Sequence, residues 1–548
     1  MKHLKFLLIL AAALTTACSG QERAAPTSGS TSESVATRPN KERAEPTSGS
    51  TSESVATRPN KERAEPTSGS TSEGLATRPN IVFILTDDLN QEVFTHAPRL
   101  RTLLTDEGTT FARHFVSLSL CCPSRIATLR GQYAHNSGIF SNHGTNGGFA
   151  KIYADGLEKS TVATWLEAAG YRTALIGKYV NGYPHSAPSK HYIPPGWTSW
   201  ISPNGGKPYH EYNYDMNENG ETVSYGHAPS DHMVDVITRK ATAFIHNTTE
   251  KFPNKPFFLY VAPYVPHGPA KAPRRYLDSF PNARAPQPPS FNEADVSDKP
   301  GWVKNKALLT PEQIQKIDDL YRRRLQTMLA VEDLVASVLD TLAETGRLDN
   351  TYVFFASDNG FHQGQHRLHS GKDTAYDEDL LVPLVVRGPG VPKGRTVSQI
   401  TANVDFAPTW AALAGVDVPA WVDGRNFAPL LHGGTPAVWR QALLLEHGGP
   451  SNTMASSDGL LEPPDDFDIQ AQASGGAPVF VGIRTATRTY VEYDTGAREL
   501  YDLNTDPNQL ANAYESTDPA VVRRLSSWVG SLKNASGAAL RNAEERSP

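Results

Sequence analysis

The eight residues IVFILTDD, Ile81 to Asp88, join an unbroken apolar run to two adjacent carboxylates. Such a run is typical of a strand buried on both faces of a parallel sheet. A second run, Thr351 to Ala356, is followed by Ser357, Asp358 and Asn359. The pattern predicts two central strands of an α/β domain, each ending in acidic or amide side chains.

A helical pattern precedes the second strand. Apolar residues recur there at spacings of three and four and predict a helix that ends near Gly346; they are Met328, Val331, Val335, Val338 and Leu342. Apolar runs at 257–262 and 381–386 predict two more strands, and Asp405 is expected to cap a helix that runs to about Leu413. Helices between strands predict a large, mostly parallel sheet flanked by helices.

The character of the chain changes after about residue 430. Short strands are expected at 442–445, 480–484 and 490–493, followed by a helix at about 519–532. This pattern predicts a smaller α+β domain with a short antiparallel sheet. We therefore expect a main domain at 79–430 and a C-terminal domain at 431–540.

The N-terminus predicts export. Lys2 and Lys5 precede the apolar run from Phe6 to Leu14, which is too short for a bilayer core that needs about 20 residues. Thr15, Thr16 and Ala17 then precede Cys18, as at a bacterial lipoprotein cleavage site. Residues 1–17 are therefore interpreted as a signal peptide and Cys18 as the lipidated residue of a cell-surface or periplasmic lipoprotein, with plain secretion as the alternative.

Three near-identical units, two of 20 residues and a third of 19, fill positions 22–80. They are rich in Ser, Thr, Pro and Glu and offer almost nothing apolar to bury, which argues against a solenoid. Residues 18–78 are therefore predicted to be a disordered linker, so that membrane contact is expected only through the lipid anchor. The net charge of −6 gives no basic footprint for nucleic acid.

The acidic strand ends predict a metal site. In an open α/β sheet, ligands bind at the carboxyl ends of the strands. Asp87, Asp88, Asp358 and the amide oxygen of Asn359 would form an all-oxygen site, which suits Ca²⁺ or Mg²⁺. The alternative is that Asp87 and Asp358 only cap helices or turns.

The segment CCPSRIATLRG, Cys121 to Gly131, carries the most specific motif in the chain. It resembles the signature of the type I sulfatase family, C-x-P-S-R followed by x-x-x-L-x-G, with Arg130 where Thr is usual. The resemblance implies an alkaline-phosphatase-like sulfatase fold and hydrolysis of sulfate esters. The alternative is a pair of buried structural cysteines at the start of a helix.

The resemblance also implies how Cys121 acts. In this family the corresponding cysteine is oxidised by a formylglycine-generating maturation enzyme, and the hydrated aldehyde is both the nucleophile and a metal ligand. Arg125, one helical turn further on, would support the diol and balance the carboxylates. Cys122 is expected to be a packing residue.

Further residues take roles from the family motifs. Lys178 matches the G-K motif that contacts sulfate, and His267 the P-H-x-P histidine near the sulfate and ester oxygens. Lys372 matches the lysine that follows D-N-G and would polarise the leaving group. Many relatives have a His where Val180 stands, so Asn181 is expected to substitute for it. His362 is a further candidate for the substrate pocket.

Within the family, the chain resembles N-acetylglucosamine-6-sulfatases and extracellular heparan 6-O-endosulfatases. The shared features are the Cys121-Cys122 doublet, Gly177-Lys178-Tyr179 with Asn181, Tyr212-Asn213-Tyr214, and Asp358 to His362. The segment Glu499 to Leu503 resembles a general sulfatase signature of the small domain. The shared features imply a sulfated carbohydrate substrate, with 6-O-sulfated N-acetylglucosamine or a related glycan as the expected one.

Three rival functions stay open at this stage. The chain would be an arylsulfatase of broad specificity if the pocket residues outside the shared motifs had diverged from those of the sugar sulfatases. The same scaffold also serves phosphodiester and phosphonate monoester hydrolases. A tethered glycan-binding protein without catalysis is the non-enzymatic alternative, and it requires that Cys121 is never converted.

Overall fold

The computed structural model describes residues 78–448 and 476–546. The predicted signal peptide, Cys18 and nearly all of the predicted linker lie outside the described residues. Within these residues, no helix combines the length and the apolar character needed to cross a bilayer.

The main sheet has ten strands in the order β13-β2-β12-β9-β1-β8-β4-β5-β6-β7. The strand β1 (Asn80–Thr86) lies between β9 (Thr351–Ser357) and β8 (Phe257–Ala262), parallel to both. The other strands are β2 (Thr109–Phe111), β4 (Arg172–Gly177), β5 (Ser199–Gly206), β6 (Tyr214–Glu218), β7 (Glu221–Tyr225), β12 (Leu384–Arg387) and β13 (Arg395–Val397). The centre is parallel, as predicted, because β4 also pairs with β8 in parallel.

One predicted strand differs from the expectation. The apolar run at 381–386 forms a strand only from Leu384, because the helix α11 (Asp377–Leu380) and Pro383 precede it. This strand, β12, runs antiparallel to β9. Apolar composition identified the buried position of the run but carried no information about its direction.

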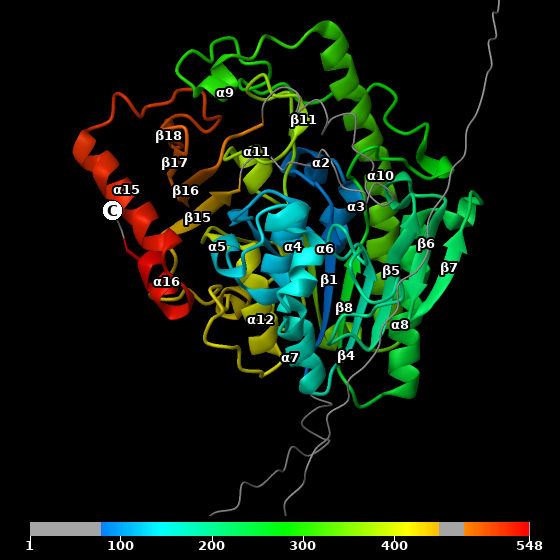
Figure 1. The fold of residues 1–548 in the computed structure, drawn as a ribbon. Coiled ribbons are helices and arrows are strands. Elements are labelled where there is room, and N and C mark those ends of the chain that lie inside the picture. Colours follow the sequence, from blue (N-terminus) through cyan, green and yellow to red (C-terminus); the bar gives the residue numbers. More distant parts are fainter. Residues whose placement is uncertain (1–77, 449–475, 547–548) are drawn as a thin grey trace, which may run out of the picture. The chain divides into compact units, whose positions relative to one another are not determined.

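Helices cover both faces of the main sheet (Figure 1), and an apolar cluster lies on each face. Successive residues of a strand point to opposite faces. Val82 and Ile84 of β1 therefore pack with α8 (Met233–Lys251) and α10 (Pro311–Glu344). Phe83, between them, packs with α4 (Cys121–Arg130), α7 (Val162–Ala168) and α12 (Phe406–Leu413) on the other face.

The predicted helix before β9 is the C-terminal part of α10. Thr310 caps its start by accepting from the backbone N–H of Gln313, whose side chain accepts in return from the Thr310 N–H. Pro311 then occupies the first helical position, where its missing N–H costs little. The helix ends at Glu344, and Gly346 follows with a left-handed φ of 65°. The end of the helix was predicted, whereas its early start was not.

Short elements complete the main domain. The helices are α2 (Gln91–Thr95), α3 (Pro98–Leu100), α5 (Ala134–Ser137), α6 (Gly148–Ala154), α9 (Gly301–Lys304) and α13 (Ala428–Leu431). Two small sheets pair β10 (His362–Gln363) with β11 (Ser370–Gly371) and β3 (His114–Phe115) with β14 (Thr401–Ala402).

The C-terminal region forms a separate antiparallel sheet, as predicted. Its strands are β15 (Ala442–His447), β16 (Phe480–Thr485), β17 (Arg488–Tyr493) and β18 (Arg498–Asp502). The helices α15 (Pro519–Lys533) and α16 (Gly537–Glu544) follow. Leu443, Ile483 and Trp528 share one apolar cluster, so α15 packs on this sheet. The strand β18 was not predicted, although it carries the Glu499-Leu500-Tyr501 motif.

The capping role predicted for Asp405 is wrong. The helix α12 begins at Phe406, but the Asp405 side chain makes no capping hydrogen bond. Its carboxylate instead pairs with Arg440, at 2.6 and 2.8 Å, and accepts from the backbone N–H of Arg425. Arg440 also lies 2.9 Å from Glu544 of α16. Burial of an ionised carboxylate costs free energy unless a charged partner compensates it, so Asp405 pairs with Arg440 rather than with the helix N-terminus.

Replacing Arg440 by alanine should therefore destabilise the protein strongly. Asp405 would keep a buried charge without its arginine partner, and Glu544 would keep only Arg425. Such a loss costs about 3–5 kcal/mol of unfolding free energy. Urea unfolding measures the loss. Lys393→Ala is the control, because Lys393 pairs with Glu107 on the surface and such pairs contribute at most about 1 kcal/mol. Equal stabilities of the two variants would contradict the assignment.

Candidate active site

The carboxyl ends of the two predicted central strands, β1 and β9, lie side by side in the structure. Strands β1 and β9 are paired in register up to Thr86 and Ser357, so the residues after them emerge side by side. The backbone N–H of Asp88 donates to Asp358 Oδ1 at 3.1 Å, and Asn359 Nδ2 donates to Asp88 Oδ1 at 2.6 Å. These side chains are buried. The acidic ends of the strands therefore form one cluster.

Cys121 is the first residue of α4 and faces this cluster. Its Sγ lies 3.3 Å from Asp87 Oδ1 and 2.9 Å from Lys372 Nζ. Burial, reinforced by the charge of Asp87, raises the pKa of the Cys121 thiol well above its usual value. The unmodified side chain is therefore a protonated thiol near neutral pH, which is a poor nucleophile.

Arg125 lies one turn along α4, as predicted, and is fully buried. Its Nε and one terminal nitrogen contact Asp358 Oδ2, each at 2.8 Å. Its other terminal nitrogen donates to the carbonyl of Lys178 at 3.1 Å. The guanidinium thus connects the two strand ends to the end of β4 and neutralises Asp358.

Lys178, directly after β4, completes the neutralisation. Its Nζ lies 2.5 Å from Asp87 Oδ2. Burial favours the neutral form of Asp87, but the charges of Lys178 and His267 outweigh it and hold its pKa below the usual value. His267 Nε2 is 3.6 Å from Asp88 Oδ2. Both predicted cations therefore lie at the carboxylates.

Two tyrosines that sequence reasoning missed surround Lys178. Its Nζ lies 5.0 Å from the ring centroid of Tyr209 and 5.7 Å from that of Tyr264. The Tyr209 ring is also 4.7 Å from the ring of His267. Such geometry permits cation–π attraction. Tyr209 lies in the 3₁₀ turn Pro208–His210, and no local motif marks it.

The loop after β9 brings Lys372 into the cluster. Lys372 Nζ lies 2.6 Å from Asp88 Oδ1. His362 instead turns its Nδ1 toward Asp379, at 2.9 Å. Asp379 also accepts from the backbone N–H of Thr374 at 3.0 Å, so it ties together both ends of the loop that carries Lys372. Asn181 is buried, and its carbonyl accepts from the Phe149 N–H.

Arg324 is a third residue that sequence reasoning missed. It extends from α10 and donates to the backbone carbonyl of Asp88 and, at 2.6 Å, to Gln363 Oε1. Its exposure is 1%. An arginine on the buried face of an amphipathic helix was a usable signal, because such a charge requires partners in the interior.

The cluster fits a divalent cation. Ligand atoms of Asp87, Asp88, Cys121 and His267 all lie within 4.8 Å of one another. Among the described residues, no donor contacts the buried Asn359 Oδ1. The set contains the predicted Asp87, Asp88 and Cys121, and His267 joins them. Asp358 Oδ2 accepts from Arg125 and its Oδ1 from the Asp88 N–H, and its role as a metal ligand stays a prediction.

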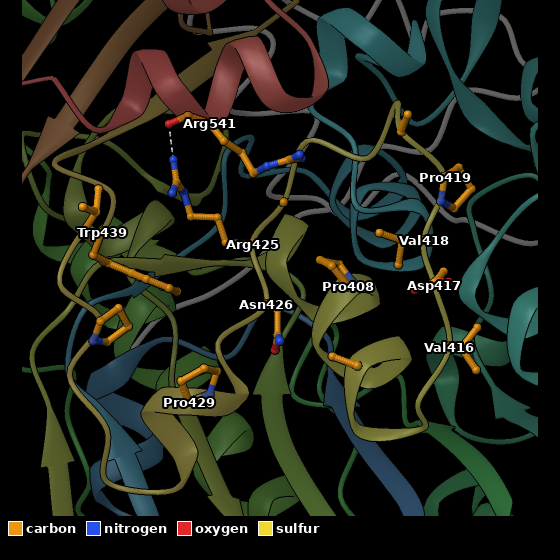
Figure 2. A pocket seen from close by; sticks show the side chains of 15 residues that line it. Pro408, Val416, Asp417, Val418, Pro419, Arg425, Asn426, Pro429, Trp439 and Arg541 are labelled. Atoms are coloured by element: carbon orange, nitrogen blue, oxygen red, sulfur yellow. Dashed lines mark hydrogen bonds between the residues drawn. The ribbon is translucent and has the colours of Figure 1, made fainter.

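A separate cavity of about 490 Å³ lies elsewhere, beside α12 and α16 (Figure 2). Prolines, Trp439 and two arginines line it. Arg425 is already occupied, because it donates to Glu544 and Glu545 at 3.0 and 2.7 Å. None of the predicted site residues lines this cavity, so it is distinct from the cluster around Cys121.

Comparison with known proteins agrees with this geometry. A profile of the sulfatase family matches residues 79–416. The human N-acetylglucosamine-6-sulfatase is 32% identical over 479 residues, which cover 84% of this chain and 85% of that protein. The extracellular sulfatase SULF-1 homolog of Drosophila melanogaster is 35% identical over 68% of this chain and 33% of that protein.

The fold has a corresponding match among solved structures. One of them, determined in complex with its substrate D-glucosamine-2-N,6-O-disulfate, has a TM-score of 0.66 and 26% sequence identity to this chain. The match covers 83% of this chain and 97% of that one. The motif at Cys121, the paired strand ends and these likenesses agree, and the chain therefore belongs to the sulfatase family.

Proposed function

We propose that this sulfatase acts on a sulfated glycan, with 6-O-sulfated N-acetylglucosamine or a related sugar as substrate, through a formylglycine made from Cys121. The observation that carries the proposal is the position of Cys121 Sγ, within 3.3 Å of both the Asp87 carboxylate and the Lys372 ammonium. The names of the human relative and of the substrate in the matched structure support the choice of sugar.

The residues around position 121 suit the chemistry of a hydroxyl nucleophile. Hydrated formylglycine supplies one hydroxyl for attack on sulfur and a second whose deprotonation expels sulfate. Asp87 Oδ1 is close enough to accept a proton from a group at this position. Lys372 Nζ, on its other side, would donate to the ester oxygen of the leaving group.

The positive side chains would bind the sulfate. Lys178 and His267 lie at the carboxylates and would contact sulfate oxygens, while Arg125 keeps Asp358 neutralised. Asp87, Asp88, Asp358 and Asn359, together with position 121, would hold Ca²⁺ or Mg²⁺. A bound divalent cation supplies charge that lowers the pKa of a hydroxyl and offsets the sulfate oxygens. Asn181 and His362 are proposed to contact the sugar.

We further propose export with an anchor at Cys18, and division into a catalytic domain at 79–430 and a C-terminal domain at 431–540. The extracellular name of the Drosophila relative supports export. The separate sheet of β15 to β18 supports the domain boundary. Labelling with a radioactive fatty acid tests Cys18, with Cys18→Ser as the control.

A substrate panel tests the proposed function. Purified protein, with conversion of Cys121 verified by mass spectrometry, is assayed on N-acetylglucosamine-6-sulfate, 4-nitrophenyl sulfate and a 4-nitrophenyl phosphodiester. We expect the highest kcat/KM on the sugar sulfate. A preference for the aryl sulfate would indicate a broad arylsulfatase, and a preference for the phosphodiester would indicate the phosphodiesterase alternative. Binding of glycans without any turnover by the converted protein would indicate a binding protein.

The aromatic contact of Lys178 leads to a smaller predicted effect. Tyr209→Leu removes the ring beside Lys178 and His267, and a cation–π contact of about 1 kcal/mol corresponds to a loss of roughly fivefold in kcat/KM. Tyr209→Phe keeps the ring and should stay within about twofold of the wild type. Steady-state kinetics on one sulfate ester measure both variants. Similar losses in both would show that the hydroxyl group matters instead.

A further inference from the structure

Three basic residues lie close together in the segments that carry Tyr209 and His267. They are Lys207, His210 and Lys271, which we call the basic rim. His210 directly follows Tyr209, whose ring lies 4.7 Å from that of His267. Lys271 Nζ lies 2.9 Å from His210 Nδ1. Both lysines are exposed, so the rim lies at the surface next to the buried cluster.

Some lysines near the surface are paired with carboxylates, whereas the two lysines of the basic rim are not. Lys151 pairs with Asp155 at 2.7 Å and Lys240 with Glu218 at 2.5 Å. Within residues 78–448 and 476–546, no carboxylate forms an ion pair with either lysine of the rim. This is notable in a chain whose net charge is −6.

Glu211, the acidic residue next to the basic rim in sequence, does not form an ion pair with the rim. Glu211 follows His210, but its side chain turns inward and is 1% exposed. Burial raises the pKa of Glu211 well above its usual value, and its Oε2 lies 3.8 Å from Nδ1 of the buried His232. The Glu211 carboxyl group therefore faces the protein interior and not the basic rim.

The backbone of the rim is fixed before any ligand arrives. The Lys207 N–H donates to the Asn213 carbonyl at 2.9 Å. The carbonyl of Lys271 is 2.9 Å from Nε2 of the buried His232. Binding would thus order only the long side chains, which lowers its entropic cost.

The contact between Lys271 and His210 also determines which ring nitrogen of His210 can donate a hydrogen bond. A lysine ammonium can only donate, so His210 Nδ1 accepts and the proton of the neutral ring is on Nε2. Two lysines and this N–H together provide donors for the oxygens of one anionic group. Burial, followed by the charges of Lys271 and Lys207, holds the pKa of His210 below its usual value, and a bound anion would relieve that repulsion.

We propose that the basic rim is a subsite for a second anionic group of the substrate, a sulfate or carboxylate that is not the one hydrolysed. The proposal rests on the proposed function, because it takes the hydrolysed sulfate to lie at His267. It assigns to this enzyme a glycan that carries at least two negative charges, rather than a singly sulfated sugar.

Binding measurements test the subsite without depending on turnover. In a Cys121→Ala background, isothermal titration compares protein with and without Lys207→Ala and Lys271→Ala. The probes are N-acetylglucosamine-6-sulfate, glucosamine-2-N,6-O-disulfate, and a disaccharide of a uronic acid with N-acetylglucosamine-6-sulfate. Two exposed charge contacts correspond to about a five- to tenfold change in Kd. We expect that loss for a doubly charged probe and less than about a twofold change for the singly sulfated sugar.

The probes identify the anion, and a matched variant controls for net charge. Loss confined to the disulfate assigns the rim to a sulfate on the same sugar, and loss confined to the disaccharide assigns it to a neighbouring carboxylate. Lys151→Ala with Lys240→Ala removes two paired lysines and should change no Kd. Equal weakening of all probes, no weakening, or no binding of any probe would overturn the proposal. Failure of the converted wild type to hydrolyse any sugar sulfate would instead refute the proposed function.

Discussion

Cys121→Ala should retain the fold and lose at least about 10⁴-fold in kcat, because removal of a catalytic nucleophile has effects of this size or larger. The side chain lies between Asp87 Oδ1 and Lys372 Nζ, so no neighbouring residue replaces it. Steady-state kinetics on a sulfate ester measure the loss, and circular dichroism confirms the fold. Substantial residual turnover in purified protein would contradict the assignment of Cys121.

Cys122 offers a matched control one residue away. Its side chain packs with Ile126 and Leu129 in the apolar layer under α4. Cys122→Ala should cost roughly 1–2 kcal/mol of unfolding free energy and leave kcat within about threefold of the wild type. Mass spectrometry of the peptide that spans both cysteines should show formylglycine, with its lower mass, at position 121 only. Formylglycine at position 122 instead would show that Cys122 is the precursor of the nucleophile and Cys121 the packing residue.

Removal of divalent cations is expected to have the second-largest effect. Ligand atoms of Asp87, Asp88, Cys121 and His267 converge, and a metal at such a site contributes several kcal/mol to transition-state stabilisation. Exhaustive chelation should therefore lower kcat by at least about 10³-fold. Titration with Ca²⁺ and with Mg²⁺ should restore it, and the ion that does so at the lower concentration is the better fit. Full activity at a metal content far below one ion per chain would refute the site.

Asp88→Asn separates a specific site from a general salt effect. The change removes a charge that Lys372 and the cation share, so activity should stay low when the cation is restored. Ligand binding stabilises the native state by an amount that grows with concentration over Kd. Added Ca²⁺ or Mg²⁺ should thus raise the Tm of the wild type and leave that of Asp88→Asn nearly unchanged. Equal Tm shifts would place the ion elsewhere.

The sequence by itself determined the central strands, their acidic ends and the α4 motif. These features are local: an apolar run predicts a buried strand, and the carboxyl ends of parallel strands meet at one edge. Asp87, Asp88, Asp358 and Asn359 were therefore predicted, whereas Cys121 and Arg125 followed from the resemblance of the α4 motif to the sulfatase signature. The antiparallel C-terminal sheet was likewise visible from short strands between turns.

Tertiary structure alone decided which distant side chains surround these residues. Tyr209, Arg324 and the basic rim lie in segments without a local motif, and only packing brings them to the strand ends. Lys178, His267 and Lys372 were predicted through family motifs, but their distances to Asp87 and Asp88 depend on the pairing of β4, β8 and β9. Asp405 shows the same limit, because its partner Arg440 is 35 positions away. Local propensity describes a residue and its near neighbours, whereas buried charges are paired by the whole fold.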